Sequence, residues 1–260
     1  MIIDTHCHLD DKQFDADLDD VIKRARCSGV GNIIIPGADI NDVKKARNIA
    51  YAYDDVFFAV GVHPYNLSDW DEDRLLEFAD DPKCVAVGEC GLDYFRLKED
   101  FQSDEERIAE KEMQKKVFIS QIRLATKLKK PLIVHARDAN QDVYDILKEH
   151  GKDLVGGVFH CFNASELLLD FEKFYYGIGG VLTFKNAKNL VEILPKIPIS
   201  KLLVETDAPY LAPTPNRGKR NEPSYTTLVV DKMSEILGFS VSEIESITTK
   251  NAKELFKIKE

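Results

Sequence analysis

Short apolar runs recur along the whole chain, and the segments between them carry apolar residues at helical spacing. Runs of this length, bounded by polar residues, indicate buried strands. We expect eight strands near Ile2–Thr5, Asn32–Ile35, Val56–Val62, Cys84–Gly88, Leu132–Val134, Val155–Phe159, Tyr175–Gly179 and Lys201–Glu205. Helices are expected over Leu18–Cys27, Ile40–Tyr53, Glu72–Ala79, Ile108–Lys129, Ala139–Lys148, Ser165–Lys173, Asn189–Leu194, Ser224–Leu237 and Val241–Phe256.

The alternation of strand and helix indicates the fold class. Such alternation predicts parallel strands joined by right-handed crossovers. Eight strand-helix units in 260 residues predict an α/β fold, a closed (β/α)8 TIM barrel. No repeat or low-complexity tract interrupts the pattern, so residues 1–260 are expected to form a single domain. The charged stretch Lys98–Lys116 is expected to be a solvated loop that leads into a helix.

Composition narrows the setting of the protein. The chain is 44% apolar and 31% charged, as in ordinary globular proteins, and no apolar run is long enough to cross a bilayer. Because it enters a strand directly, without a leader, we expect a cytoplasmic location and no membrane contact. Five cysteines without framework spacing do not predict a disulfide scaffold. The net charge of −10 weakly opposes binding to a polyanion, and no obligate protein partner is evident.

Potential metal ligands stand just after the apolar runs. His6 and His8 follow the first run, and side chains two apart in an extended segment point the same way. Five of the six histidines and two carboxylates share this placement: His6, His8, His63, Glu89, His135, His160 and Asp207. Active-site residues of such barrels come from the C-terminal ends of the strands. The sequence therefore predicts a metal centre at one mouth of the barrel.

The donor types do not name the metal. Several imidazoles suit Zn²⁺, Mn²⁺, Fe²⁺ or Ni²⁺ better than Mg²⁺, which prefers oxygen. Three cysteines, Cys7, Cys90 and Cys161, each follow a proposed ligand, and the two-residue period turns them to the opposite face. We interpret them as small apolar packing residues rather than ligands.

Taken together, the strand-end motifs resemble one known family over the whole chain. The matching segments are Asp4-Thr5-His6-Cys7-His8-Leu9, Gly61-Val62-His63-Pro64, Gly88-Glu89-Cys90-Gly91-Leu92-Asp93, His135-Ala136-Arg137-Asp138, His160-Cys161-Phe162, Glu205-Thr206-Asp207-Ala208-Pro209 and the Arg217–Pro223 loop. They resemble the TatD family of metal-dependent deoxyribonucleases, within the amidohydrolase-like barrels. The resemblance implies a divalent-metal-dependent exonuclease on single-stranded DNA, in a family where some members also act on RNA or double strands.

The resemblance also implies a ligand set for two divalent ions. His6, His8 and Asp207 would hold one ion, His135 and His160 the other, and Glu89 would bridge both. Mg²⁺ or Mn²⁺ is the metal that the family implies in function, whereas the ligand chemistry alone suggests that Zn²⁺ could be trapped in crystals.

Two cations address both ends of phosphodiester hydrolysis. At about 3.5–4 Å apart, one lowers the pKa of the attacking water and the other neutralises charge on the non-bridging and leaving oxygens. The two oxygens of Glu89 suit the bridging role. Asp207 is the best candidate for the general base, because one carboxylate oxygen can ligate a metal while the other orients the water.

Substrate contacts are expected from a second group of residues. Arg137 stands two residues after His135, so it should reach the mouth, where its planar fork suits a phosphate; a salt bridge with Asp138 or Asp207 is the alternative. Arg217 and Arg220 form a compact basic loop after the last strand, a favoured place for phosphate sites, or else an ordinary solvated turn. The remaining candidates are His63, placed by its motif, and Tyr94, which with Phe95 could stack a base or pack at the rim.

Three functional classes remain in view. The first is a metal-dependent nuclease. The second is a barrel hydrolase acting on another bond, such as an aminoacyl-tRNA ester or a cyclic amide. Many such enzymes bridge their metals with a carboxylated lysine where this chain has Glu89, which favours the nuclease. The third is a non-catalytic binding protein, which would lack a ligand or base, whereas all six expected ligand positions are filled.

Overall fold

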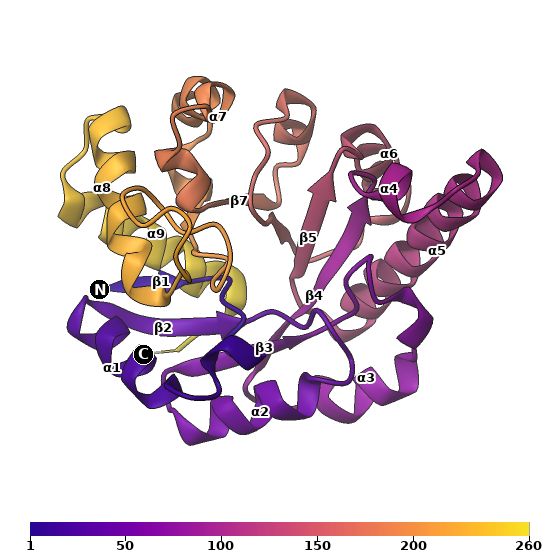
Figure 1. Ribbon diagram of the computed structural model, residues 1–260, viewed down its shortest axis with the longest axis horizontal. Coiled ribbons are helices and arrows are strands. Elements are labelled where there is room, and N and C mark those ends of the chain that lie inside the picture. The colour runs from indigo at the N-terminus through magenta and orange to yellow at the C-terminus, as the bar shows by residue number, and fades with distance from the viewer. Residues whose placement is uncertain (260) are drawn as a thin grey trace.

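The computed structural model describes residues 1–259 and shows eight parallel strands in sequence order around a barrel, with helices on the outside (Figure 1). The strands are β1 (Ile2–Asp4), β2 (Val30–Ile35), β3 (Val56–Val60), β4 (Cys84–Asp93), β5 (Leu132–Arg137), β6 (Gly157–Phe159), β7 (Phe174–Ile178) and β8 (Leu202–Val204). The helices are α1 (Leu18–Cys27), α2 (Val43–Ala52), α3 (Glu72–Ala79), α4 (Leu97–Asp100), α5 (Asp104–Leu128), α6 (Asn140–His150), α7 (Lys188–Ile193), α8 (Thr226–Leu237) and α9 (Val241–Phe256). The predicted single-domain TIM barrel is confirmed.

The barrel closes where β8 meets β1. Each of the other neighbouring strands pairs along several residues. At the seam, Thr5 N–H donates to the Val204 carbonyl at 3.1 Å, and Cys7 pairs with Ala208 beyond the strand ends. The closing contacts therefore lie in the segments that carry His6, His8 and Asp207.

Two apolar layers follow from the two-residue period of the strands. Inward-facing side chains form one buried cluster inside the barrel, among them Ile3, Ile133, Val158 and Leu203. Alternate residues face outward and pack beneath the helices in a second cluster. The end of α9, with Leu255 and Phe256, joins the inner cluster and closes the N-terminal end of the barrel. The opposite, C-terminal end is left for the site.

Two predicted segments differ in the structure. Ser165–Lys173 was expected to be an α-helix, but it forms a single 3₁₀ segment at Glu166–Asp170. Lys98–Lys116 was expected to be a loop, but most of it lies in α4 and the first half of α5. Ser103 caps α5 in a capping box with Glu106, so the charged face there is a solvated helix rather than a loop. Across residues 1–259, every helix is too short or too polar to span a lipid bilayer.

Candidate active site

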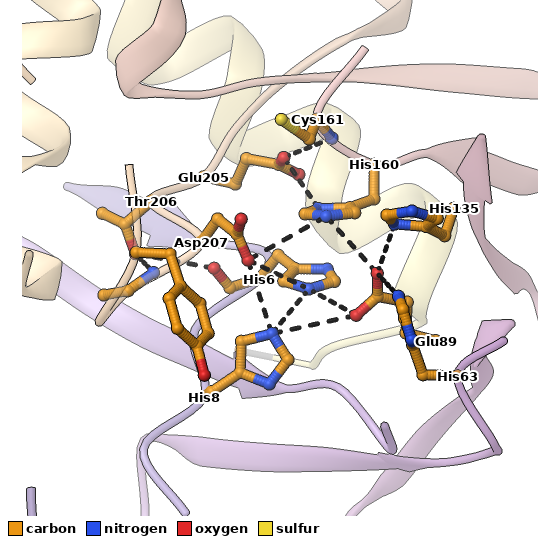
Figure 2. A network of polar contacts seen from close by, with 12 residues as sticks. His6, His8, His63, Glu89, His135, His160, Cys161, Glu205, Thr206 and Asp207 are labelled. Atoms are coloured by element: carbon orange, nitrogen blue, oxygen red, sulfur yellow. Dashed lines mark hydrogen bonds and ion pairs between the residues drawn. The ribbon is translucent and has the colours of Figure 1, made fainter. Parts of the chain in front are cut away.

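Alternate residues of each strand face the inside of the barrel, and at the mouth the next inward-facing positions carry polar side chains. His135 stands two residues after the inward-facing Ile133, and His160 two after Val158. Side chains two apart share a face, so both histidines point along the barrel axis. Figure 2 shows them near Glu89 of β4 and near His6, His8 and Asp207, which follow the ends of β1 and β8. The two-residue alternation that directs apolar side chains into the inner core thus also brings the predicted ligands together.

His6, His8 and Asp207 form one half of the cluster. The Nε2 atoms of the two histidines are 3.3 Å apart, and Asp207 Oδ1 lies 3.8 Å from His6 Nε2 and 3.4 Å from His8 Nε2. His6 is fully buried. One ligand atom from each of these residues lies within 4.8 Å of the others, a spacing that suits a shared metal ion. The three residues match the first predicted ligand set.

Glu89 lies at the centre of the cluster, and its two oxygens face different halves. Oε2 is 3.2 Å from His6 Nε2 and 3.8 Å from His8 Nε2. Oε1 is 2.9 Å from His135 Nδ1 and 3.5 Å from His160 Nε2 (Figure 2). Burial alone would raise the pKa of Glu89, but the surrounding histidines hold it well below its ordinary value. This orientation is the one that a bridging carboxylate requires.

His135 and His160 form the other half, and each contacts a second carboxylate on its far side. His135 Nε2 lies 2.9 Å from Asp93 Oδ2, and His160 Nδ1 lies 2.9 Å from Glu205 Oε1. Burial would lower the pKa of His160, but the carboxylates of Glu205 and Glu89 outweigh it and raise the pKa to about 10. A carboxylate behind a histidine fixes the ring so that its other nitrogen points at a metal.

Two glycines make room for this arrangement. A Cβ on Gly177 would lie 2.1 Å from Glu205 Oε2, so a side chain there would displace that buried carboxylate. Gly91 has a φ of +139°, and a Cβ there would lie 2.0 Å from the carbonyl oxygen of His135. Only glycine readily adopts this backbone and allows so close an approach. Gly91 therefore lets β4 run on beside β5 as far as Asp93.

Helix α5 fixes two points of the site through buried amides. Gln114 accepts from the Asp93 N–H at 2.9 Å and donates to the Asp93 carbonyl at 3.1 Å. Two turns further along the helix, Gln121 makes the same reciprocal pair of hydrogen bonds with the backbone of Val62, at 2.8 and 2.9 Å. Residues seven apart lie on the same side of a helix. The pair thus sets the backbone of Asp93 and of the residue preceding His63.

His63 reaches the cluster as a neutral imidazole. Its Nε2 lies 3.7 Å from Glu89 Oε1, and its Nδ1 accepts from the Tyr65 N–H at 3.1 Å. Burial lowers the pKa of His63 to about 3. Since Nδ1 is an acceptor, the single proton is assigned to Nε2, which then points into the site as a donor.

The ligands at the seam are held through the main chain. The buried Asp4 accepts from Thr206 Oγ1 at 2.6 Å and from the backbone N–H groups of Thr206 and His6. Asp207 N–H donates to the His6 carbonyl at 2.8 Å. Burial raises the pKa of Asp4 to about 8. The segments that carry His6 and Asp207 are thereby tied to each other.

A cavity of about 750 Å³ opens above the cluster. His8, His63, Glu89, His135, His160 and Asp207 line it, together with Arg137 and Cys161. Cys7 and Cys90 pack in the outer core as expected, whereas Cys161 lies at the cavity wall. Burial raises the pKa of the Cys161 thiol well above its ordinary value, so the thiol stays protonated.

The predicted substrate residues are not all at the cavity. Arg137 lines it, with its guanidinium carbon 3.7 Å from the centroid of the Phe95 ring, and makes no ion pair among residues 1–259. Tyr94 turns away and donates to Asp142 at 2.7 Å. Arg217 stacks on Phe184, and Arg220 pairs with Asp17 at 2.7 Å. None of these last three is among the described residues that line the cavity, and their role in substrate binding stays a prediction.

Asp93 and Glu205 were missed as site residues. Both belong to motifs recognised in the sequence, but neither was assigned a role. Glu205 shares the parity of Leu203 and Asp207, so the period of the strand could have placed it at the mouth. Asp93 lies beyond the predicted end of its strand, and only the extension of β4 to that residue brings it to His135.

Comparison with known proteins identifies the family. TatD related DNases match residues 3–257 of the chain.

The chain belongs to the TatD family.

Its relatives include the uncharacterized metal-dependent hydrolase YabD of Bacillus subtilis, 44% identical over 99% of this chain and 100% of the relative. The 3'-5' ssDNA/RNA exonuclease TatD of Escherichia coli K12 is 34% identical over 99% of both chains. The crystal structure of YjjV, a TatD homolog from the same organism, superposes with a TM-score of 0.88 at 30% identity, covering 99% of this chain and 98% of that one. This TatD-family protein is thus a metal-dependent hydrolase.

The residues present fit a bound divalent metal, as the family implies. Potential metal ligands form three groups, and within each group the ligand atoms lie within 4.8 Å of one another. The groups are His6 with Glu89 and His160, His6 with His8 and Asp207, and His63 with Asp93 and His135. In the first two, imidazole nitrogens and carboxylate oxygens converge as divalent metals require. In the third, Nδ1 of His63 already accepts a hydrogen bond, which leaves its proton on Nε2 and disfavours ligation.

Proposed function

We propose that this TatD-family hydrolase is a two-metal nuclease that removes nucleotides from an end of single-stranded DNA, and that it also accepts RNA. The observation that carries the proposal is the placement of Glu89, whose two oxygens face two separate sets of ligands. The relative named as a 3'-5' ssDNA/RNA exonuclease supports the substrate class. The cytoplasmic location expected from the sequence stays a prediction.

Two ions would be held by distinct sets of side chains. His6, His8 and Asp207 would hold one, and His135 and His160 the other, with Glu89 contributing one oxygen to each. Bound Mg²⁺ or Mn²⁺ would lower the pKa of the attacking water and offset the negative charge that builds on the phosphate oxygens.

Asp207 is the proposed general base. Burial would raise its pKa, but hydrogen bonding to His8 and the charges of the nearby histidines hold the pKa below its ordinary value. The carboxylate is thus ionised at neutral pH and can take a proton from water. His63 is proposed to donate its Nε2 proton in a hydrogen bond to a phosphate oxygen, because that nitrogen points into the cavity.

Arg137 is the proposed phosphate ligand at the cavity. Its guanidinium has no acidic partner among residues 1–259, so its donors remain available to substrate. Arg217 and Arg220 would contact more distant phosphates. Arg217→Ala and Arg220→Ala should then raise KM more than they lower kcat, whereas Arg137→Ala should lower kcat as well. An unchanged KM in the Arg217 and Arg220 variants would show that these two arginines do not contact the substrate.

The test is cleavage of end-labelled single-stranded and duplex DNA and RNA by metal-stripped protein. Mg²⁺, Mn²⁺ and Zn²⁺ are added back separately, and Glu89→Gln serves as the matched control. The proposal predicts a ladder of products that shorten from one end when wild-type protein is given metal. Metal-stripped protein and the Glu89→Gln variant should give no ladder. Absence of cleavage with every metal, together with hydrolysis of an aminoacyl ester or a cyclic amide, would replace the nuclease with another hydrolase.

A further inference from the structure

The two sides of the cavity differ sharply in charge, and one side is basic and aromatic. Arg96, from the loop that follows β4, and Arg137, the last residue of β5, both line it. Arg96 lies 5.4 Å from the centroid of the Tyr65 ring, and Arg137 lies 3.7 Å from that of Phe95. Among residues 1–259 neither guanidinium has a carboxylate within ion-pair distance.

The rings on this side are open to solvent. Phe95 is 48% exposed and Tyr65 is 42% exposed. Exposed aromatic faces next to unpaired guanidinium groups are what single-stranded nucleic acids require, because bases stack on the rings while phosphates pair with the cations. We refer to Tyr65, Arg96 and Arg137, which line the cavity, and to Phe95, which lies against Arg137, as the basic wall.

The segments that follow β1 and β2 line the cavity with four acidic residues: Asp10, Asp11, Asp39 and Asp42. We call these four residues the acidic wall. Lys45 donates to the Asp10 carbonyl and to the Asp15 carboxylate, so its one positive charge lies beside four acidic residues and offsets only part of their charge. The acidic wall therefore keeps a net negative charge, which repels phosphate groups.

The metal ligands line the same cavity as both walls, so a strand that continues from a scissile phosphate over the metal ligands can run over either wall. We propose that the cavity admits a nucleic-acid end in one orientation: the polymer continues over the basic wall, and the terminal nucleoside, ending in a hydroxyl group, faces the acidic wall. The enzyme then discriminates against an end that carries a phosphate. This inference rests on the proposed nuclease function and adds the chemistry of the end that is digested.

The charges support this orientation over its reverse. A strand running the other way would bring its row of phosphates against four carboxylates and leave two guanidinium groups unpaired. A terminal phosphate monoester carries close to two negative charges near neutral pH, whereas a terminal hydroxyl carries none. The end group is therefore the part of the substrate that the acidic wall distinguishes best.

The experiment uses one single-stranded DNA oligonucleotide prepared with a hydroxyl or a phosphate at each end. With wild-type protein and Mn²⁺, a phosphate on the digested end should lower kcat/KM about tenfold, and a phosphate on the other end should have less than a twofold effect. The double variant Asp39→Asn, Asp42→Asn should reduce the tenfold discrimination to about twofold. Asparagine keeps the shape of both residues, so the folded protein is retained.

The basic wall is tested with the same substrates. Arg96→Gln and Arg137→Gln should each raise KM about tenfold for all end groups alike, since a lost charge-assisted contact is expected to weaken binding by about that factor. Arg26→Gln is the matched control, because Arg26 pairs with Asp55 before β3, at the other end of the barrel. Its KM should stay within twofold of wild type.

Binding separates this inference from the nuclease proposal. The Asp207→Asn variant is titrated with labelled oligonucleotides and followed by fluorescence anisotropy. Tighter binding of the hydroxyl end supports the orientation even if no cleavage occurs in wild type, an outcome that would contradict only the nuclease. Equal kcat/KM and equal affinity for hydroxyl and phosphate ends, while DNA is cleaved, would overturn the orientation and leave the nuclease in place.

Discussion

The two halves of the metal cluster are held in different ways. In the half from β5 and β6, His135 and His160 each have a carboxylate 2.9 Å behind the ring, from Asp93 and Glu205. Neither His160 Nδ1 nor His6 Nδ1 makes a hydrogen bond of regular geometry among residues 1–259. The difference is that His160 Nδ1 has the Glu205 carboxylate within ion-pair distance, whereas the carboxylates near His6, those of Glu89 and Asp207, face its Nε2 atom. In the half from β1 and β8, orientation comes from the main-chain contacts at the seam. The first half is fixed by side chains, and the second by barrel closure.

This difference has an energetic consequence. A carboxylate behind a histidine raises the basicity of the ring and limits its rotation, which strengthens metal binding. We therefore expect the ion between His135 and His160 to be bound more tightly than the ion between His6 and His8. Glu89 contributes one oxygen to each half, so it couples the two.

Glu89→Gln should have the largest effect, because it acts on both halves. The amide keeps the shape of the side chain but removes the charge that balances two cations. At least one ion should be lost, and hydrolysis should fall by at least about 10⁴-fold, beyond the usual contribution of a general base. Metal content and DNA hydrolysis are measured on the same preparation. Retention of both ions with a near wild-type rate would show that Glu89 does not bridge.

Asp207→Asn should affect rate more than binding. As the proposed base, Asp207 should contribute about 10²–10⁴-fold to kcat, while His6, His8 and Glu89 still hold part of the metal in that half. Metal titration and single-turnover kinetics separate the two effects. Parallel losses of metal affinity and of rate would argue that Asp207 is a ligand only.

Variants of the two backing carboxylates test the comparison itself. Asp93→Asn and Glu205→Gln should weaken the tighter of two metal-binding phases by about 10–100-fold, read by competition with a fluorescent chelator. Asp42→Asn, at the cavity but in contact with neither histidine, should leave both phases unchanged. If the weaker phase changes instead, the assignment of the tight ion to His135 and His160 is wrong.

The smallest effect is expected at the seam, where Arg24 of α1 contacts Glu222 at 2.7 Å. Burial would raise the pKa of Glu222, but hydrogen bonds from Arg24 and Ser224 hold it below the ordinary value of 4.5. The ionised form is thus stabilised, a contribution that is complete above pH 4.5 and lost as the pH falls through the lower pKa of the folded state.

Glu222→Gln should therefore lower the free energy of unfolding by about 1 kcal/mol at pH 7. The difference from wild type should shrink as the pH falls below 4.5. Urea unfolding at several pH values measures it. Glu235→Gln, which loses only an exposed pair with Lys232, is the control and should match wild type. A difference that stays constant down to acid pH would contradict the role given to the Glu222 charge.

Much of the fold was accessible from the sequence because strands and ligands share one period. All eight strands and their order were predicted, and the residues two positions beyond Ile133 and Val158 were correctly expected at the mouth. The α-helix predicted over Ser165–Lys173 was wrong, because apolar spacing over so few residues does not distinguish an α-helix from a 3₁₀ segment.

The parts of the site that were missed depend on tertiary contacts. Asp93 reaches His135 only because Gly91 lets β4 continue beside β5. No local sequence pattern predicts this extension of the strand. Arg96 lies in a loop, and its place at the cavity follows from the path of that loop. Periodicity predicts which way a strand residue points, but it does not predict where a loop residue arrives.

The most direct test of the two-metal account is the rate of single-stranded DNA cleavage as Mn²⁺ is added to metal-stripped protein in known equivalents. If both halves must be filled, the first equivalent should bind with little activity, and the rate should rise as the second equivalent binds and level off at two per chain. Full activity at one equivalent per chain would contradict the account, because a single half of the cluster would then suffice.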